Sequence, residues 1–138
     1  MKKSEQKRET IINAASAILV REGFSALTIS ALARESGLSR GLLHYYFESK
    51  EDILLGVMRS IYEGSLGLSS LNKTGAATPE ELARTAAGVL RTTLEVSPEY
   101  FRLHFDCIRL SRESEKLRAE LMSMLADYRA DIEDEVRD

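Results

Sequence analysis

Apolar residues recur at every third or fourth position in each long segment of this chain, and no segment alternates apolar and polar residues as a half-buried strand does. The first such segment ends before Gly23, a residue that suits the end of a helix. Its apolar side chains share one predicted face: Ile11, Ile12, Ala15, Ile18 and Leu19. The repeating pattern predicts an all-α fold, with a first helix from about Glu5 to Glu22.

Hydroxyl side chains mark the predicted starts of the next three helices, because serine and threonine can accept a hydrogen bond from a free N–H of the first turn. Thr28 precedes a short helix that Gly37 ends. Residues 39–47 form another short helix, with a serine at its start. Ser49 begins a longer helix, in which Asp52 stands at the reciprocal capping position.

The stretch 64–78 is rich in glycine and small polar residues, so its first part can continue the fourth helix while its later part is a loop. A Thr-Pro pair then begins a fifth helix over residues 78–96. The Ser-Pro pair at 97–98 restarts the chain in the same manner. Either Ser111 or Ser114 can cap the last helix.

Charge is distributed unevenly along the chain. Residues 1–50 hold eight Lys and Arg against five Asp and Glu, whereas residues 51–138 hold eleven against seventeen. The basic part can attract phosphate locally even though the net charge is −3. Surface statistics alone can also produce such an asymmetry.

The composition is that of a soluble globular protein, with 43% apolar and 30% charged residues and no long uncharged apolar run. The basic start of the chain leads into an amphipathic segment, so we expect a cytoplasmic protein rather than a secreted one. Cys107 is the single cysteine, which excludes an internal disulfide and a site built from cysteines alone. We expect no cofactor and no metal.

Residues 28–47 supply each part of a helix-turn-helix, in which a second helix presents its N-terminal residues to the major groove of DNA. Gly37 suits the tight turn because glycine takes a positive φ at little cost. Apolar residues stand where the helices must pack together: Leu32, Ala33, Leu38 and Leu43. The pattern predicts a DNA-reading head.

The start of the second helix of this motif carries the residues for base recognition. Arg40 can form a bidentate pair with a guanine edge, and Gly41 lets the backbone approach closely. Donors to phosphate gather further along: His44, Tyr45, Tyr46 and Lys50. Tyr46 can equally belong to the core, as we expect for Phe47.

The segment from Thr28 to Leu54 resembles the DNA-binding signature of the TetR family of bacterial regulators, without a gap. The resemblance implies a three-helix DNA-binding domain over residues 1–48. It implies a helical domain over residues 49–138 that binds a small molecule. It also implies a homodimer on a palindromic operator, with repression relieved by ligand as the usual mode.

Matched by position, Arg40 and Gly41 fall where the family contacts bases. Leu42 either touches a thymine methyl group or packs against the protein. At position 44 many members of the family have tyrosine where this chain has histidine. The expected phosphate contacts are Thr28, Ser39, His44, Tyr45, Tyr46 and Lys50.

The C-terminal part is similar to the family only in outline, because members usually continue with two more helices that form the dimer interface. We expect either a shortened chain or another dimer surface. One seam of the last predicted helix is the candidate for that surface and would then be partly exposed. It consists of Leu117, Leu121, Leu125, Tyr128 and Ile132.

A ligand site in this part should be mostly apolar with few polar anchors. Its candidate residues can equally be ordinary core, since aromatic and methionine side chains at helical spacing often are. They are Met58, Tyr62, Arg84, Arg91, Phe101, His104, Phe105, Met122 and Tyr128.

Two other functions stay open at this point. An enzyme would rest on His104, Asp106 and Cys107, but no oxyanion-type loop accompanies them, and we expect no enzyme. A helical protein-interaction module that binds no specific DNA is the stronger alternative. Only a DNA reader should lose affinity for random duplex steeply as salt is added.

Overall fold

The computed structural model describes residues 2–63 and 78–137, without the side chains of residues 131, 132, 135 and 136. In these ranges every regular element is a helix, which confirms the all-α prediction. The elements are α1 (Lys3–Glu22), η1 (Phe24–Ala26), α2 (Ile29–Ser36), α3 (Arg40–Tyr46), α4 (Lys50–Glu63), α6 (Pro79–Val96), α7 (Glu99–Ser111) and α8 (Glu115–Arg137). The loop predicted between residues 64 and 77 lies outside the described residues.

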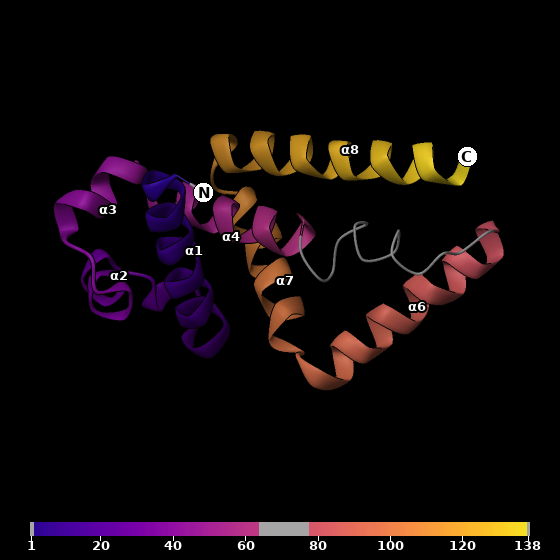
Figure 1. The fold of residues 1–138 in the computed structure, drawn as a ribbon, viewed down its shortest axis with the longest axis horizontal. Coiled ribbons are helices and arrows are strands. Elements are labelled where there is room, and N and C mark those ends of the chain that lie inside the picture. Colours follow the sequence, from indigo (N-terminus) through magenta and orange to yellow (C-terminus); the bar gives the residue numbers. More distant parts are fainter. Residues whose placement is uncertain (1, 64–77, 138) are drawn as a thin grey trace.

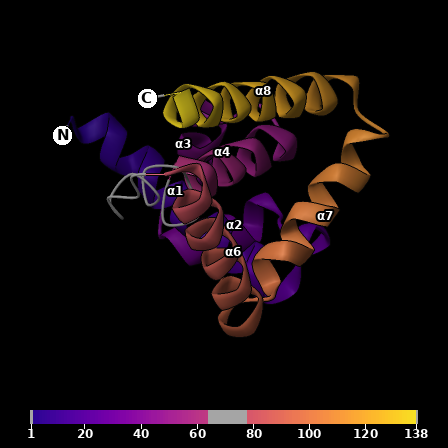
Figure 2. The same ribbon diagram turned by 90° about the vertical axis from the view of Figure 1, so that its right-hand side faces the viewer.

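The first three α-helices gather at one end of the molecule, and α4 and α7 occupy its middle (Figure 1). From there α8 runs toward the other end, while α6 and α7 meet in a V. Figure 2 shows the same arrangement from the side, with α8 lying along α4. The helix-turn-helix is therefore at the opposite end from the C-terminus of α8.

The helix-turn-helix forms by the local signals that the sequence carries. Oγ1 of Thr28 accepts a hydrogen bond from the N–H of Ala31 at 3.1 Å, which caps α2. Oγ of Ser39 accepts from the N–H of Leu42 at 3.2 Å, which caps α3. Between them Gly37 has a φ of +71°, a left-handed conformation that glycine adopts without steric cost.

The later helix starts were predicted correctly except for one cap. Ser49, Thr78 and Ser114 each accept a hydrogen bond from the N–H three residues further on, at 3.2 Å. The expected cap at the Ser-Pro pair was wrong, since no side chain caps α7. A main-chain turn takes its place, because the carbonyl oxygens of Ser97 and Pro98 accept from the N–H groups that follow.

A single apolar core runs through both predicted domains. Leu32 and Leu43 of the helix-turn-helix are fully buried, and so are Leu54 of α4, Leu103 of α7 and Leu117 of α8. All five belong to one continuous cluster of buried side chains. The three-helix head is thus packed against the helices that follow it.

The first part of the α8 seam lies against this core, while the residues that follow it remain partly exposed. Leu117 and Leu121 are buried within the chain, while Leu125 and Tyr128 are half-buried. The side chain of Ile132 is outside the described residues. The apolar pattern arises because α8 packs on α4 and α7, and those two helices cover the seam.

Two polar contacts also tie the C-terminal helices to the first four. From α7, Arg102 donates hydrogen bonds to the main-chain oxygens of Leu19, at 3.2 Å, and Val20, both in the last turn of α1. From α8, Nζ of Lys116 lies 2.8 Å from Oδ1 of Asp52. The Asp52 carboxylate, which the sequence places at a capping position, therefore also pairs with a neighbouring helix.

Candidate nucleic-acid interface and ligand cavity

The N-terminal end of α3 presents its side chains to solvent. Arg40 is exposed, and its Nη2 donates a 2.7 Å hydrogen bond to Oγ of Ser30 on α2. This bond restrains the guanidinium while leaving its other N–H groups exposed to a ligand. The residue predicted to read bases is thus supported by the other helix of the motif.

The next two positions differ in their surroundings. A Cβ built on Gly41 would meet no atom within 4 Å, so the backbone here borders open space. Leu42 is half-buried, which fits partial packing against the protein and leaves some of its surface accessible. The N-terminal end of α3 can therefore bring its backbone close to a binding partner.

The aromatic residues of α3 take different positions. Tyr45 is 79% exposed, and its ring meets that of Tyr46 edge to face, with centroids 5.2 Å apart. Tyr46 is half-buried and donates its hydroxyl to Oγ of Ser4 at 3.2 Å. His44 is exposed, whereas Phe47 is buried as expected.

Two of the remaining phosphate candidates flank this helix. Thr28 is exposed at the start of α2. Lys50 is half-buried at the start of α4, and its Nζ lies 4.5 Å from the centroid of the Phe24 ring, a cation–π geometry. Lys50 therefore has a partner within the protein before any DNA is bound.

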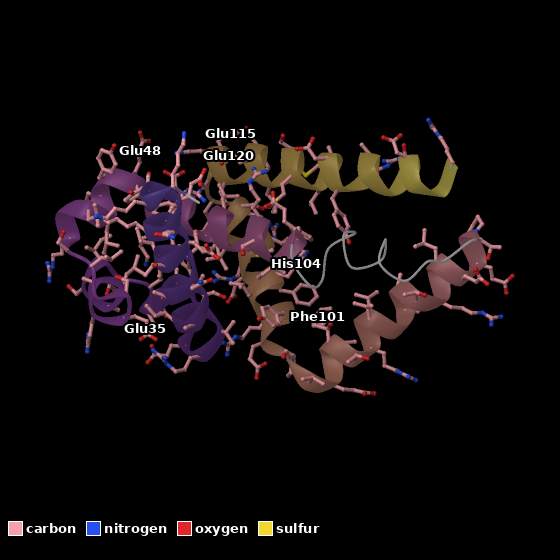
Figure 3. All side chains as sticks on the ribbon, in the orientation of Figure 1. Glu35, Glu48, Phe101, His104, Glu115 and Glu120 are labelled. Atoms are coloured by element: carbon pink, nitrogen blue, oxygen red, sulfur yellow. The ribbon has the colours of Figure 1, made fainter. Side chains whose placement is uncertain are left out.

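A cavity of about 410 Å³ lies between α4, α6, α7 and the middle of α8. Five of the predicted ligand-site residues line it: Met58, Tyr62, Phe101, His104 and Tyr128. Figure 3 shows Phe101 and His104 on the same side of α7, toward α6. The described part of its wall is completed by Ile61, Ala86, Val89, Leu90 and Tyr100.

The polar centre of the cavity is a tyrosine–histidine pair. The Tyr62 hydroxyl lies 3.0 Å from both ring nitrogens of His104, and the Tyr128 ring lies 5.2 Å from that of Tyr62. Burial lowers the pKa of His104 below its usual value and raises the pKa of Tyr62 to about 12. Both groups are therefore neutral at pH 7.

Four predicted ligand-site residues do not line the cavity. Arg84 is exposed and pairs with Glu80 at 2.9 Å along the surface of α6. Arg91 is exposed on the same helix. Phe105 and Met122 are 67% and 61% exposed, because they lie on the outer faces of α7 and α8.

The sequence analysis missed the α6 wall of the cavity, formed by Ala86, Val89 and Leu90, and also Tyr100 and Ile61. These side chains are small or aliphatic, or stand beside a helix start, so nothing in their chemistry marks a ligand site. The sequence did contain one signal for the α6 residues: their helical spacing places them on one face of the helix.

The residues of the enzymatic alternative do not form a catalytic group. Cys107 is fully buried, and burial raises the pKa of its thiol to about 11, so it is not a thiolate at pH 7. Asp106 pairs with Arg109 at 3.5 Å. His104 is paired with Tyr62 in the cavity instead.

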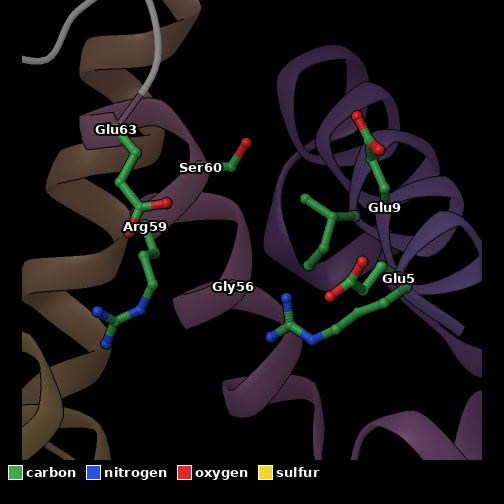
Figure 4. A pocket seen from close by; sticks show the side chains of 8 residues that line it. Glu5, Glu9, Gly56, Arg59, Ser60 and Glu63 are labelled. Carbon is green, nitrogen blue, oxygen red and sulfur yellow. The ribbon is translucent and has the colours of Figure 1, made fainter. Parts of the chain in front are cut away.

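A second hollow of about 410 Å³ lies between α1 and α4 and differs in chemistry (Figure 4). Charged side chains of both signs surround it: Glu5, Arg8, Glu9, Arg59 and Glu63, together with Ser60. The guanidinium of Arg8 also lies 5.2 Å from the centroid of the Phe47 ring. Most of its lining residues are charged, in contrast to those of the cavity beside α7.

Residues 11–57 match the family described as bacterial regulatory proteins, tetR family. The N-terminal segment 11–57 is therefore that of a tetR-family regulator. This family is one of regulators, and together with the buried thiol of Cys107 it sets the enzymatic alternative aside.

Curated members of the family share moderate identity with the chain. It is 29% identical over 112 residues to the HTH-type transcriptional regulator BetI of Rhizobium meliloti, which covers 81% of the chain and 55% of that protein. It is 33% identical over 105 residues to the uncharacterized HTH-type transcriptional regulator YerO of Bacillus subtilis. That alignment covers 76% of the chain and 35% of YerO. The chain thus spans about a third to a little over half of the length of these relatives.

Solved structures agree on the fold. A TetR family transcription regulator from Marinobacter aquaeolei VT8 superposes with a TM-score of 0.67 at 25% identity, over 94% of this chain and 68% of that one. The protein SCO7518 from Streptomyces coelicolor A3(2) gives a TM-score of 0.76 at 19% identity. The superposition covers 94% of this chain and 75% of that protein. No helix in the described ranges is long and apolar enough to cross a bilayer.

Proposed function

We propose that this chain is a transcriptional repressor that binds a palindromic DNA operator as a homodimer and is released by a small molecule. The observation that carries the proposal is the exposed N-terminal end of α3, where Arg40 is held by Ser30 and Gly41 borders open space. It stands at the place where the tetR family carries its helix-turn-helix. Residues 1–48 are then the DNA-binding domain and residues 49–138 the regulatory domain.

In this proposal α3 lies in the major groove. Arg40 and Gly41 contact bases, with Leu42 beside them against a thymine methyl group. The phosphate contacts are Thr28, Ser39, His44, Tyr45, Tyr46 and Lys50. The exposure of Tyr45 and His44 supports this assignment, because neither side chain is used by the core.

The effector site in this proposal is the cavity beside α7. Met58 and Tyr62 of α4 line it, while Lys50 at the other end of the same helix stands beside the head. From α7, Phe101 also lines the cavity, and its neighbour Arg102 binds the end of α1. A bound molecule that moves α4 or α7 therefore shifts the head away from its DNA-competent position.

Dimerisation is part of the proposed mechanism, because one reading helix covers only a half-site. Two heads about 34 to 36 Å apart reach successive major grooves on one face of the duplex. In the α8 seam the chain itself covers Leu117 and Leu121, so these two residues do not form the contact between copies. Two copies therefore bind each operator.

Selection of DNA from a random pool tests the function directly. We expect one palindromic sequence to be enriched, bound by two copies per duplex. Fluorescence anisotropy in rising salt should then show a steep loss of affinity for both the selected and a scrambled duplex, with the selected one tighter at each salt concentration. Recovery of no common sequence, with binding insensitive to salt, would favour the protein-interaction module instead.

A further inference from the structure

The walls of the cavity beside α7 define what it can hold. None of the described residues that line it is an aspartate, glutamate, lysine or arginine. An ion placed there would gain no opposite charge from these described residues, so the loss of its water would be unfavourable. The second hollow, between α1 and α4, has five charged side chains and offers the opposite environment.

The described wall carries three tyrosine hydroxyls and one imidazole, and the Tyr62 hydroxyl pairs with His104. A neutral imidazole has one N–H donor and one acceptor nitrogen, and a single hydroxyl aligns with only one nitrogen at a time. With the Tyr62 hydroxyl 3.0 Å from both nitrogens, His104 retains capacity for one more hydrogen bond. His104 is half-buried and lines the cavity, so a molecule bound there can contact its ring.

We propose that the effector is a neutral, largely apolar molecule with one hydrogen-bonding group, a hydroxyl or carbonyl, that pairs with His104. This inference rests on the proposed function, in which the cavity is the effector site. Apart from the hydroxyls of Tyr100 and Tyr128, the remaining described walls are aliphatic or aromatic, so the rest of the molecule gains from leaving water. The cavity offers such a molecule a volume of about 410 Å³.

Aromatic rings can also surround a cation, but two observations favour the neutral molecule. The Tyr62 ring already meets His104 edge to face, with centroids 5.6 Å apart, and Tyr128 at 5.2 Å. The parts of the Tyr62 ring that make these contacts are not available to a cation. In addition, the described wall offers no carboxylate to balance the charge.

Four probes of one shape separate these chemistries at pH 7: 2-naphthol, naphthalene, 2-naphthoate and a naphthyl trimethylammonium ion. Calorimetry on the 138-residue chain should give 2-naphthol the highest affinity. We expect naphthalene to bind about three- to tenfold more weakly, the worth of one buried hydrogen bond. The two ions should bind at least about tenfold more weakly than 2-naphthol.

The two histidines of the chain locate the bound probe by NMR. The ring signals of His104 should shift with 2-naphthol, and those of exposed His44 should not. In His104→Phe the preference for 2-naphthol over naphthalene should fall to about onefold. Tyr62→Phe keeps the imidazole and should retain the preference, and Ser60→Ala, in the second hollow, should change nothing.

Tighter binding of either ion, no binding of 2-naphthol, or an unchanged preference in His104→Phe would overturn the inference. These measurements contain no DNA, so they are independent of the operator assay. A chain that binds 2-naphthol as described but selects no DNA would refute the proposed function, whereas a chain that selects an operator but rejects 2-naphthol would refute only the effector class.

Discussion

Nζ of Lys116 on α8 lies 2.8 Å from Oδ1 of Asp52, so an ion pair joins α8 to the first turn of α4. Burial of the carboxylate opposes its ionisation, but the hydrogen bond and charge of Lys116 outweigh it and hold the pKa of Asp52 below its usual value. The same bond raises the pKa of Lys116.

This ion pair gives a pH prediction. A lowered folded-state pKa for Asp52 contributes stability above its unfolded value of about 3.8, which is lost as the pH falls through the lower folded value. The raised pKa of Lys116 contributes stability that is lost as the pH rises through its folded value, above about 10.5. Asp52→Asn should therefore lower the Tm at neutral pH and flatten its fall below about pH 4.

Glu48→Gln is the matched control, because the Glu48 carboxylate lies 4.0 Å from the same ammonium and its side chain is 90% exposed. It should leave the pH profile of Tm nearly unchanged. In a Lys116→Gln background, Asp52→Asn should have a much smaller effect. A full effect in that background would show that Lys116 is not the partner that matters.

The turn of the helix-turn-helix depends on one backbone conformation. Gly37→Ala should lower the free energy of unfolding by about 1 to 2 kcal/mol, because a Cβ is disfavoured at its φ of +71°. No atom lies within 4 Å of the added carbon, so backbone strain is the whole cause. Urea denaturation measures the change.

Gly41 serves as a comparison for that prediction, since it lies in a helix and also has open space around it. Gly41→Ala should leave stability unchanged or raise it, by up to about 1 kcal/mol. Equal destabilisation by both substitutions would rule out the conformational explanation.

Base discrimination by Arg40 is a further prediction. Arg40→Ala should relax the preference at one base position per half-site, at a cost of about 1 to 3 kcal/mol there. Ser30→Ala keeps the guanidinium and removes only its 2.7 Å support, so its loss should be smaller but at the same position. Competition between single-base variants of the selected operator measures both, and a uniform loss on all sequences would reassign Arg40 to phosphate.

Lys50 should contribute affinity without reading sequence. Lys50→Ala should weaken binding to every duplex and reduce the slope of log affinity against log salt by about one per subunit. Lys50→Arg keeps the charge and should keep the slope. Since Nζ already lies over the Phe24 ring in the free protein, an unchanged slope in Lys50→Ala would mean that this contact, not phosphate, is its role.

The helix-turn-helix was predictable because its signals are local. Thr28, Ser39 and Gly37 each determine the backbone within three or four residues of their own position, and the structure shows the same caps and turn. Local signals also explain the one wrong cap, since at Ser97 a main-chain turn competes with the side chain.

The cavity and the seam of α8 were less predictable because they depend on which helices meet. The apolar sequence pattern that contains Leu117 and Leu121 is the same whether the stripe packs within its own chain or against another copy. In the structure both residues are buried within the chain. Likewise Val89 and Leu90 line the cavity only because α6 and α7 meet in a V. Phe105 and Met122 have the composition of a ligand site but point away from it.

The single core has a consequence for anyone who builds chimeric regulators from this chain. Leu54 of α4 shares its buried cluster with Leu32 and Leu43 of the head and with Leu117 of α8. A chimera joined after residue 48 would combine residues 1–48 with the α4 of another protein. The buried residues before position 49, which are half of the cluster, would then lose their native packing partners. DNA specificity should therefore be changed by substituting only the exposed residues of α3. Effector response should be changed by substituting residues that line the cavity.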